Sequence, residues 1–262
     1  MQESEQQGAA PGDTLRRFYL KLLESFGPQG WWPAKTRLEI ILGAILTQNT
    51  TWRNATLALK NLRRVGRLSW VALERAPLRE LETWVRPAGF YRQKARTISF
   101  FAAWLNRTYG GSLDGLFRRE PGGVRRQLLA LKGIGPETAD AILLYAGRQP
   151  FFVADAYTRR ILSRHELIPQ SADYDFAQRY LHQHLKPDQA VFNEFHALLV
   201  EAGKRYCRRQ MAQCEECPLR EFLPQEAGAM AMAAARKSKP EIRNPDGFRV
   251  SSFEFRSPGQ LA

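Results

Sequence analysis

The sequence has few cysteines and no long apolar run. Its three cysteines lie between positions 207 and 217, too close together to form the disulfide framework of a small secreted domain. No apolar stretch reaches the roughly 20 residues that a transmembrane helix needs, and the first 13 residues lack the basic start and apolar centre of a signal peptide. We therefore expect a cytoplasmic protein with reduced thiols and no membrane partner.

Acidic residues are scarce relative to basic ones. The chain carries 26 Asp and Glu against 39 Lys and Arg, a formal net charge of +13. The excess is spread through the chain in arginine pairs rather than concentrated in one run: Arg16–Arg17, Arg63–Arg64, Arg118–Arg119, Arg125–Arg126, Arg159–Arg160 and Arg208–Arg209. A charge of this sign and distribution favours a nucleic-acid partner. A basic surface that serves only solubility is the alternative.

The alternating pattern of β-strands is missing as well. Apolar residues recur instead at helical spacing, as in Leu38, Ile41, Leu42, Ile45 and Leu46. With 262 residues the chain can form one large domain or two small ones. We predict an all-α fold of many short helices. The composition of residues 1–12 is typical of a disordered N-terminus, and that of 224–262 of a mobile basic tail.

The stretch "LKGIGPETADAILLYA" (131–146) predicts a tight hairpin that leads into a helix. Gly133 and Gly135 permit a close approach of the backbone, and Pro136 suits the first position of a helix. The N–H groups at such a helix start suit a phosphate. An ordinary helix–helix turn is the alternative, but an acid, Asp155, follows in "VADAYTRR" (153–160).

Together these segments resemble the helix–hairpin–helix, Gly/Pro-rich loop and aspartate signature of the endonuclease III-like DNA glycosylases. "ILGAILTQNTTW" (41–52) and "GFYRQKA" (89–95) resemble two further segments of that superfamily, in the same order. "WWP" (31–33) and a tyrosine two residues after Asp155 resemble its 3-methyladenine DNA glycosylase branch most. The resemblance covers about residues 15–222.

The resemblance implies a fold and a partner. It implies two helical lobes, a six-helix lobe at 35–148 and a second lobe built from 13–34 plus 149–223. Double-stranded DNA with a damaged base would lie in the groove between them, bound by a monomer. The implied activity is base excision, the hydrolysis of the N-glycosidic bond of a damaged base.

Two acids carry the implied chemistry. Asp155 matches the family's catalytic aspartate, whose carboxylate stabilises positive charge on the sugar and orients the attacking water. A helix N-cap is the alternative role, and one residue can fill both. Glu137 stands where bifunctional members carry a lysine that forms a Schiff base, which a carboxylate cannot do. We therefore expect a monofunctional enzyme without AP lyase activity, and Lys132 is not placed to replace that lysine.

An alkylated purine such as 3-methyladenine already carries positive charge, which suits an aromatic pocket. The candidates for that pocket are Trp31, Trp32, Pro33, Trp52 and Glu137. Tryptophans that only fill the core are the alternative.

Further residues match the family's DNA contacts. Gln48 matches the residue that fills the gap left by the extruded base, Asn49 follows it, and Phe90 matches an apolar wedge. In the hairpin, the expected DNA contacts are Lys132, Gly133, Ile134 and Gly135. A polar helix end at Gln48 and a buried aromatic at Phe90 are the alternatives.

The cysteines have the spacing Cys207-x6-Cys214-x2-Cys217, which resembles the family's iron–sulfur loop. A [4Fe–4S] cluster takes four cysteine ligands, but the fourth position here is Leu223. Three interpretations stay open at this stage: a cluster completed by an outside ligand, a loop that has lost its cluster, and a zinc site with a histidine or carboxylate as fourth ligand.

Two other functions compete with a monofunctional glycosylase. The first is a bifunctional endonuclease III-type glycosylase and AP lyase for oxidised pyrimidines, which the missing lysine argues against. The second is a DNA-binding protein without catalysis, which the presence of Asp155 argues against.

Overall fold

The computed structural model describes residues 10–32, 34 and 36–224. This part of the chain is helical, and its one β-type pairing is an isolated bridge between Cys207 and Ala212. The predicted all-α class is therefore confirmed. Nothing in the described helices combines the length and apolar character required to cross a membrane. Residues 1–9 and 225–262, which hold nearly all of both predicted disordered ends, lie outside the described residues.

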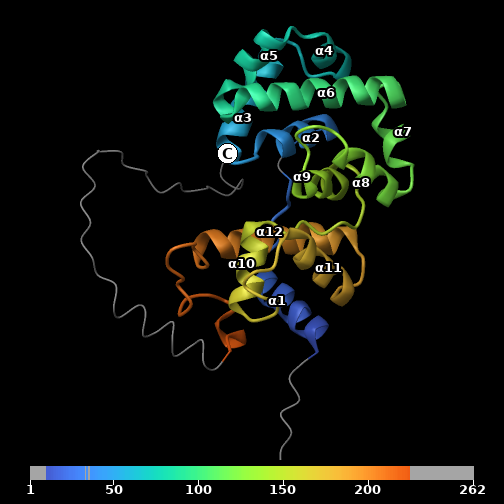
Figure 1. Cartoon of the computed structure of the whole chain (residues 1–262). Coiled ribbons are helices and arrows are strands. Elements are labelled where there is room, and N and C mark those ends of the chain that lie inside the picture. The colour runs from blue at the N-terminus through green and yellow to red at the C-terminus, as the bar shows by residue number, and fades with distance from the viewer. Residues whose placement is uncertain (1–9, 33, 35, 225–262) are drawn as a thin grey trace, which may run out of the picture.

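The helices form two lobes (Figure 1). The first lobe holds α2 (Arg37–Leu46), α3 (Trp52–Arg64), α4 (Trp70–Arg75), α5 (Leu78–Val85), α6 (Tyr91–Tyr109), α7 (Leu113–Phe117), α8 (Pro121–Leu129) and α9 (Pro136–Ala141). The second holds α1 (Pro11–Phe26), α10 (Ala156–Arg164), α11 (Tyr174–His184) and α12 (Gln189–Arg205). Short 3₁₀ turns lie at η1 (Arg86–Ala88) and η3 (Arg220–Phe222), and α9 continues as a π-helical turn, η2 (Ile142–Ala146).

Two expectations are corrected here. The described part of the first lobe contains eight α-helices rather than six, because the short α4 and α7 turn the chain between longer helices. The predicted disordered N-terminus is wrong at its end, since α1 begins at Pro11. Proline at a helix start has no N–H to leave unpaired and already has a helical φ, so it begins the helix earlier than the small polar composition indicated.

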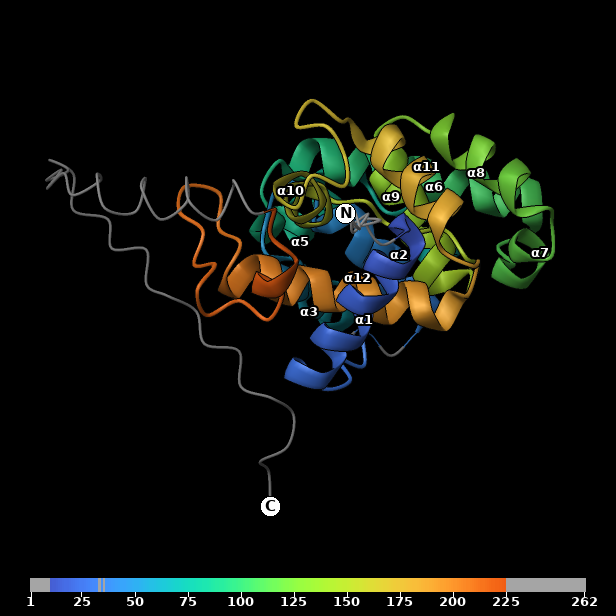
Figure 2. The same ribbon diagram turned by 90° about the horizontal axis from the view of Figure 1, so that it is seen from below.

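Side-chain caps fix where most of the helices begin. A side-chain oxygen of the residue before the helix accepts a hydrogen bond from an N–H of the first turn, and the capping residues are Thr36, Thr51, Ser69, Ser112, Glu120, Asp155, Asp173 and Asp188. Between the capped helices the core is aliphatic and aromatic, and it runs from α2, α6 and η2 into α10 and α12. Figure 2 shows α12 and α1 lying against each other in the second lobe.

Lys94 is a charged residue inside the first lobe, and its side chain is fully buried. Its ammonium group donates hydrogen bonds to the carbonyl oxygens of Leu46 at 2.9 Å and Ala88 at 2.7 Å. Burial lowers the pKa of Lys94. The two bonds join the end of α2 to the end of η1. Gln48 follows shortly after the first of these ends, and Phe90 shortly after the second.

A buried carboxylate joins α9 to the second lobe. Asp140 on α9 has no exposed surface and pairs with Arg125 of α8 through two bonds, from Nε at 2.7 Å and Nη2 at 3.0 Å. Tyr174 and Gln178 of α11 donate to the same carboxylate at 2.8 and 2.6 Å. The Gln178 amide also donates to the carbonyl oxygen of Phe152 at 2.9 Å. The network thus holds α8, α9, α11 and the segment before α10 in one arrangement.

Asp140→Asn should therefore destabilise the protein strongly. The variant leaves the Arg125 guanidinium in the interface without its buried countercharge, which costs roughly 3–5 kcal/mol in comparable buried pairs. Asp114→Asn is the matched control, because Asp114 pairs with Arg37 at 2.6 Å but its side chain is 70% exposed. The control should lose less than about 1 kcal/mol. Urea unfolding followed by circular dichroism checks both, and equal stability of the two variants would contradict the role given to Asp140.

Candidate active site

Asp155 lies where the two lobes meet, at the start of α10. It caps that helix, and its Oδ1 accepts a hydrogen bond from the Thr158 N–H at 2.8 Å. Its side chain is only 14% exposed. The segment before it, Phe152 to Ala154, is buried, so the carboxylate is fixed by a helix start on one side and by core packing on the other.

A second residue, His196 of α12, faces this carboxylate. Its Nε2 lies 3.7 Å from Oδ2 of Asp155, and its Nδ1 shares a short hydrogen bond with the hydroxyl of Tyr145 in η2. Burial and the charge of Asp155 raise the pKa of Tyr145 well above its usual value, so the Tyr145 hydroxyl stays protonated and donates a hydrogen bond to Nδ1. The Nε2 atom of the ring then faces Asp155.

The environments of Asp155 and Glu137 push their pKa values in opposite directions. Burial would raise the pKa of Asp155, but the nearby His196 ring and the hydrogen bonds from Thr158 outweigh it and the pKa is lowered. Partial burial and the negative charge of Asp155 raise the pKa of Glu137, against His196 and Arg159. Glu137 lies at the exposed rim, so solvent limits this effect. Opposite shifts in neighbouring acids are typical of catalytic sites.

The three predicted pocket tryptophans lie together. Ring centroids are 5.6 Å apart for Trp31 and Trp32, and 5.1 Å apart for Trp32 and Trp52. Trp32 also lies 4.9 Å from the ring of Tyr145, which connects this aromatic cluster to His196 and Asp155. The ammonium group of Lys204 is 5.7 Å from the Trp31 ring centroid. Pro33, the other predicted wall, lies outside the described residues.

The hairpin is built around two glycines with different surroundings. Gly133 has φ +93°, and a Cβ there would lie 2.0 Å from Oγ1 of Thr97. Gly135 precedes α9 with φ −95°, a value open to any residue, and a Cβ there would meet no protein atom within 4 Å. The fold therefore requires glycine at 133, whereas glycine at 135 leaves space beside the start of α9 for something outside the chain.

The neighbours of these glycines divide into inward and outward residues. Lys132 is exposed. Ile134 is 5% exposed and its N–H bonds to the carbonyl of Leu131 at 3.1 Å. The side chain and the N–H of Ile134 both anchor the hairpin to the core, and its contact with DNA stays a prediction.

Gln48, Asn49 and Phe90 lie at the ends of their helices. The Gln48 amide donates to the carbonyl oxygen of Gly133 at 3.0 Å and to Oγ1 of Thr138 at 2.9 Å, so it braces the hairpin here. Asn49 and Phe90 have φ +52° and +45°, conformations that few side chains adopt. Phe90 is also 66% exposed. An exposed aromatic on a strained backbone suggests a contact surface.

The three cysteines line a small cavity together with Leu223, the residue at the fourth ligand position. Cys207, Cys214, Cys217 and Leu223 line a space of about 20 Å³, along with His165, room for about one water molecule. Burial raises the pKa of Cys217 to about 11. Across the described residues no three metal-binding side chains come close enough to hold one ion. Three thiols and Leu223 supply one cysteine fewer than the four that a [4Fe–4S] cluster takes.

Sequence reasoning missed three residues of this site: Tyr145, His196 and Arg159. His196 did carry a signal, because it is one of only four histidines and interrupts the apolar stripe of α12. Tyr145 looked like core, and it is 6% exposed. Its role depends on a contact with a residue 51 positions away, which no local pattern shows.

The two hairpin glycines should respond differently to the same change. Gly133→Ala places a methyl group against Thr97 in a backbone conformation that alanine rarely adopts, so the protein should lose at least about 1–3 kcal/mol of stability. Gly135→Ala should leave stability within about 0.5 kcal/mol. Thermal unfolding of both variants measures this, and similar losses would contradict the division between them.

Known proteins are similar to this chain over most of its length. The family model of the HhH-GPD superfamily base excision DNA repair proteins matches residues 42–187. A putative DNA repair glycosylase of Methanocaldococcus jannaschii is 39% identical over 80% of this chain and 96% of its own. Endonuclease III of Sulfolobus acidocaldarius is 28% identical over 80% of this chain and 95% of its own.

Solved structures share the fold. A trapped endonuclease III–DNA covalent intermediate superimposes with a TM-score of 0.71 and 21% identity, over 84% of this chain and 98% of that one. The 3-methyladenine DNA glycosylase of H. pylori bound to 1,N6-ethenoadenine has a TM-score of 0.64 and 27% identity, over 74% of this chain and 97% of that one.

Proposed function

The chain belongs to the HhH-GPD superfamily of base excision DNA repair proteins, and from this premise we propose that it is a monofunctional DNA glycosylase for alkylated purines such as 3-methyladenine. It acts as a monomer on double-stranded DNA, in the cytoplasm or nucleoid. Asp155 is its catalytic carboxylate, and water is its nucleophile.

One observation carries the monofunctional assignment: the acid at position 137 lies beside the acid at position 155. Covalent catalysis needs an amine at the sugar carbon, whereas Glu137 brings a second carboxyl group close enough for the charge of Asp155 to raise its pKa. Lys94 does not replace that amine, because its ammonium group is buried and bonded to two carbonyls. Two acids suit hydrolysis, in which charge is stabilised and a proton is moved.

The reaction follows from the ionisation of Asp155. As the bond from C1′ to the base nitrogen breaks, the electron pair leaves with the base and positive charge develops on the sugar. The ionised carboxylate stabilises that charge. A water oxygen then bonds to C1′ and releases its proton to the carboxylate or to solvent. The Nε2 atom of His196 faces the same carboxylate and favours its charged form.

An alkylated purine fits this site because its base is a cation that leaves as a neutral molecule. Such a base needs little protonation, so the enzyme has to bind it and stabilise the sugar. The aromatic cluster of Trp31, Trp32 and Trp52 offers faces that attract a cation, and the Lys204 ammonium already lies over Trp31. The indole N–H groups of Trp31 and Trp32 are buried and make no hydrogen bond. Both therefore remain as hydrogen-bond donors for a ligand that reaches them.

DNA binding uses the outward features of the first lobe. A Cβ at Gly135 would face open space, and the first N–H groups of α9 are unpaired within the helix, which suits the close approach of a phosphate. The exposed ring of Phe90 suits insertion into the base stack. The net charge of +13 adds general attraction.

Asp155→Asn should reduce release of 3-methyladenine from a lesion-bearing duplex by roughly 10²–10⁴-fold, while duplex affinity changes by less than about twofold. Asp173→Asn is the matched control. Asp173 also caps a helix, with a bond of 2.8 Å from Phe176 N–H, so the control changes a capping carboxylate to an amide without touching catalytic charge. Single-turnover excision across a panel of lesions measures both. Equal activity of the two variants would show that Asp155 is not the catalytic carboxylate. Release of oxidised pyrimidines alone would show that the proposed substrate class is wrong.

Borohydride should not trap the wild-type protein on lesion DNA, because no amine stands at position 137 to form a Schiff base. Glu137→Lys should produce a trapped adduct, since it places an amine beside Asp155. Denaturing electrophoresis after reduction detects the covalent complex. Efficient trapping of the wild type would contradict the monofunctional assignment and indicate endonuclease III-type chemistry through another lysine.

A further inference from the structure

Tyr145 and His196 form a buried polar pair behind the carboxylate of Asp155. Both residues are 6% exposed, and the Tyr145 hydroxyl and Nδ1 of His196 share a hydrogen bond. The two side chains come from different elements, η2 and α12. Polar groups are costly to bury unless their hydrogen bonds are made, so the second nitrogen of the His196 ring needs an explanation.

That second nitrogen, Nε2, has no partner in the free protein. It is buried and makes no hydrogen bond, and it lies 3.7 Å from Oδ2 of Asp155, beyond hydrogen-bond distance. Oδ1 of the same carboxylate accepts the Thr158 N–H, so Oδ2 is the oxygen that faces the ring. A movement of roughly 0.5–1 Å brings Nε2 and Oδ2 within hydrogen-bond range. Catalytic hydrogen bonds are often long in a free enzyme and shorten when the substrate binds.

The position of the ring proton follows from the partners of the two nitrogens. In a neutral imidazole one nitrogen donates and the other accepts, and the bond made by one nitrogen decides the state of the other. Nδ1 accepts from the Tyr145 hydroxyl, which burial keeps protonated, so the ring proton is on Nε2. The opposite tautomer would point a lone pair of Nε2 at the negative charge of Asp155, which is unfavourable.

We propose that His196 is a positioning residue for Asp155, and that Tyr145 holds it in the tautomer that this requires. When lesion DNA is bound, Nε2–H donates to Oδ2 and fixes the carboxylate toward the sugar. The Tyr145 ring lies 4.9 Å from the ring of Trp32, so a base that stacks on Trp32 supplies the small movement that closes the gap. The inference rests on the proposed function in taking Asp155 as the catalytic carboxylate.

Nitrogen NMR of protein labelled at histidine tests the tautomer without any substrate. The protonated Nε2 and the unprotonated Nδ1 of His196 should give well-separated ¹⁵N shifts, and the His196→Gln variant identifies these signals among the four histidines. In Tyr145→Phe, Nδ1 loses its donor and the two tautomers should mix. A wild-type ring that carries its proton on Nδ1 would overturn the proposal.

Single-turnover excision tests the positioning role, on the damaged base that the wild type releases. His196→Met removes the N–H but keeps a side chain of similar length, and should lower the rate constant by about 10–100-fold with little change in duplex affinity. His196→Gln offers an amide N–H near the position of Nε2 and should recover most of the rate. Tyr145→Phe should cost about 3–10-fold, but nothing further in the His196→Met background, where no tautomer is left to select.

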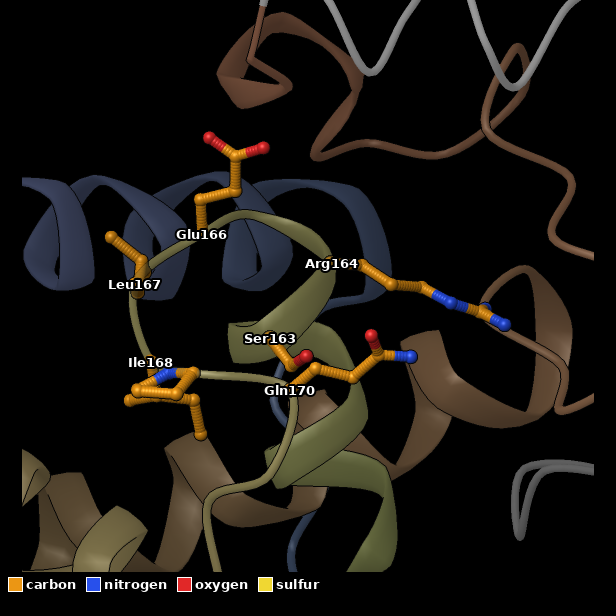
Figure 3. Close-up of a pocket in the computed structure, with 7 residues that line it drawn as sticks. Ser163, Arg164, Glu166, Leu167, Ile168 and Gln170 are labelled. Carbon is orange, nitrogen blue, oxygen red and sulfur yellow. The ribbon is translucent and has the colours of Figure 1, made fainter.

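His165→Met is the matched control. His165 lies at the other end of α10, and its Nδ1 bonds to the carbonyl oxygen of Phe222 at 3.1 Å. Figure 3 shows its chain neighbours Arg164 and Glu166, which line a separate cavity there. This variant also loses a histidine hydrogen bond, but its excision rate should stay within about twofold of the wild type.

Equal losses in the His196→Met and His196→Gln variants that follow their thermal stability would show a merely structural histidine and overturn the proposal. A fully active His196→Met beside an inactive Asp155→Asn would remove this inference alone, whereas a fully active Asp155→Asn would remove the proposed function as well. Release of a different damaged base would contradict only the substrate class, because each variant is compared with the wild type on that base.

Discussion

The buried carboxylate of Asp140 is the constraint on which the rest of the structure depends. It lies on the helix that follows the hairpin, and it is bonded to α8 on one side and to α11 on the other. An unpaired charge in this position would be very unfavourable, so the two lobes are held in the one arrangement that satisfies it. That arrangement places Glu137, three residues before Asp140, next to Asp155 of the other lobe.

The electrostatics of the site follow from this junction. Asp155 keeps its charge because a helix N–H and the imidazole of His196 both face it. The charge of Asp155 in turn disfavours ionisation of the Glu137 carboxyl group. One chain of contacts, from Trp32 through Tyr145 and His196 to Asp155, runs from the aromatic cluster to the carboxylate. A base held against the aromatic rings would thus lie close to the group that stabilises its sugar.

The features assigned to DNA binding share a second property: the fold itself does not require them. Gly135 could carry a side chain without touching the protein, and Phe90 is a large exposed aromatic on a strained backbone. Gly133, Ile134 and Lys94, by contrast, are fully explained by contacts within the chain. The proposed DNA contacts therefore use residues whose placement the fold does not explain.

The sequence by itself determined the helical class, the hairpin and the helix start at Asp155, because periodicity, glycine, proline and capping residues act within a few positions of the chain. It also determined that position 137 carries an acid and that the fourth cysteine is absent. Tertiary structure alone decided that Ile134 points inward, that Gln48 braces the hairpin, and that Tyr145, His196 and Arg159 belong to the site. Those outcomes depend on packing between helices far apart in the chain, where burial and pairing of charges are set by partners that no local pattern specifies.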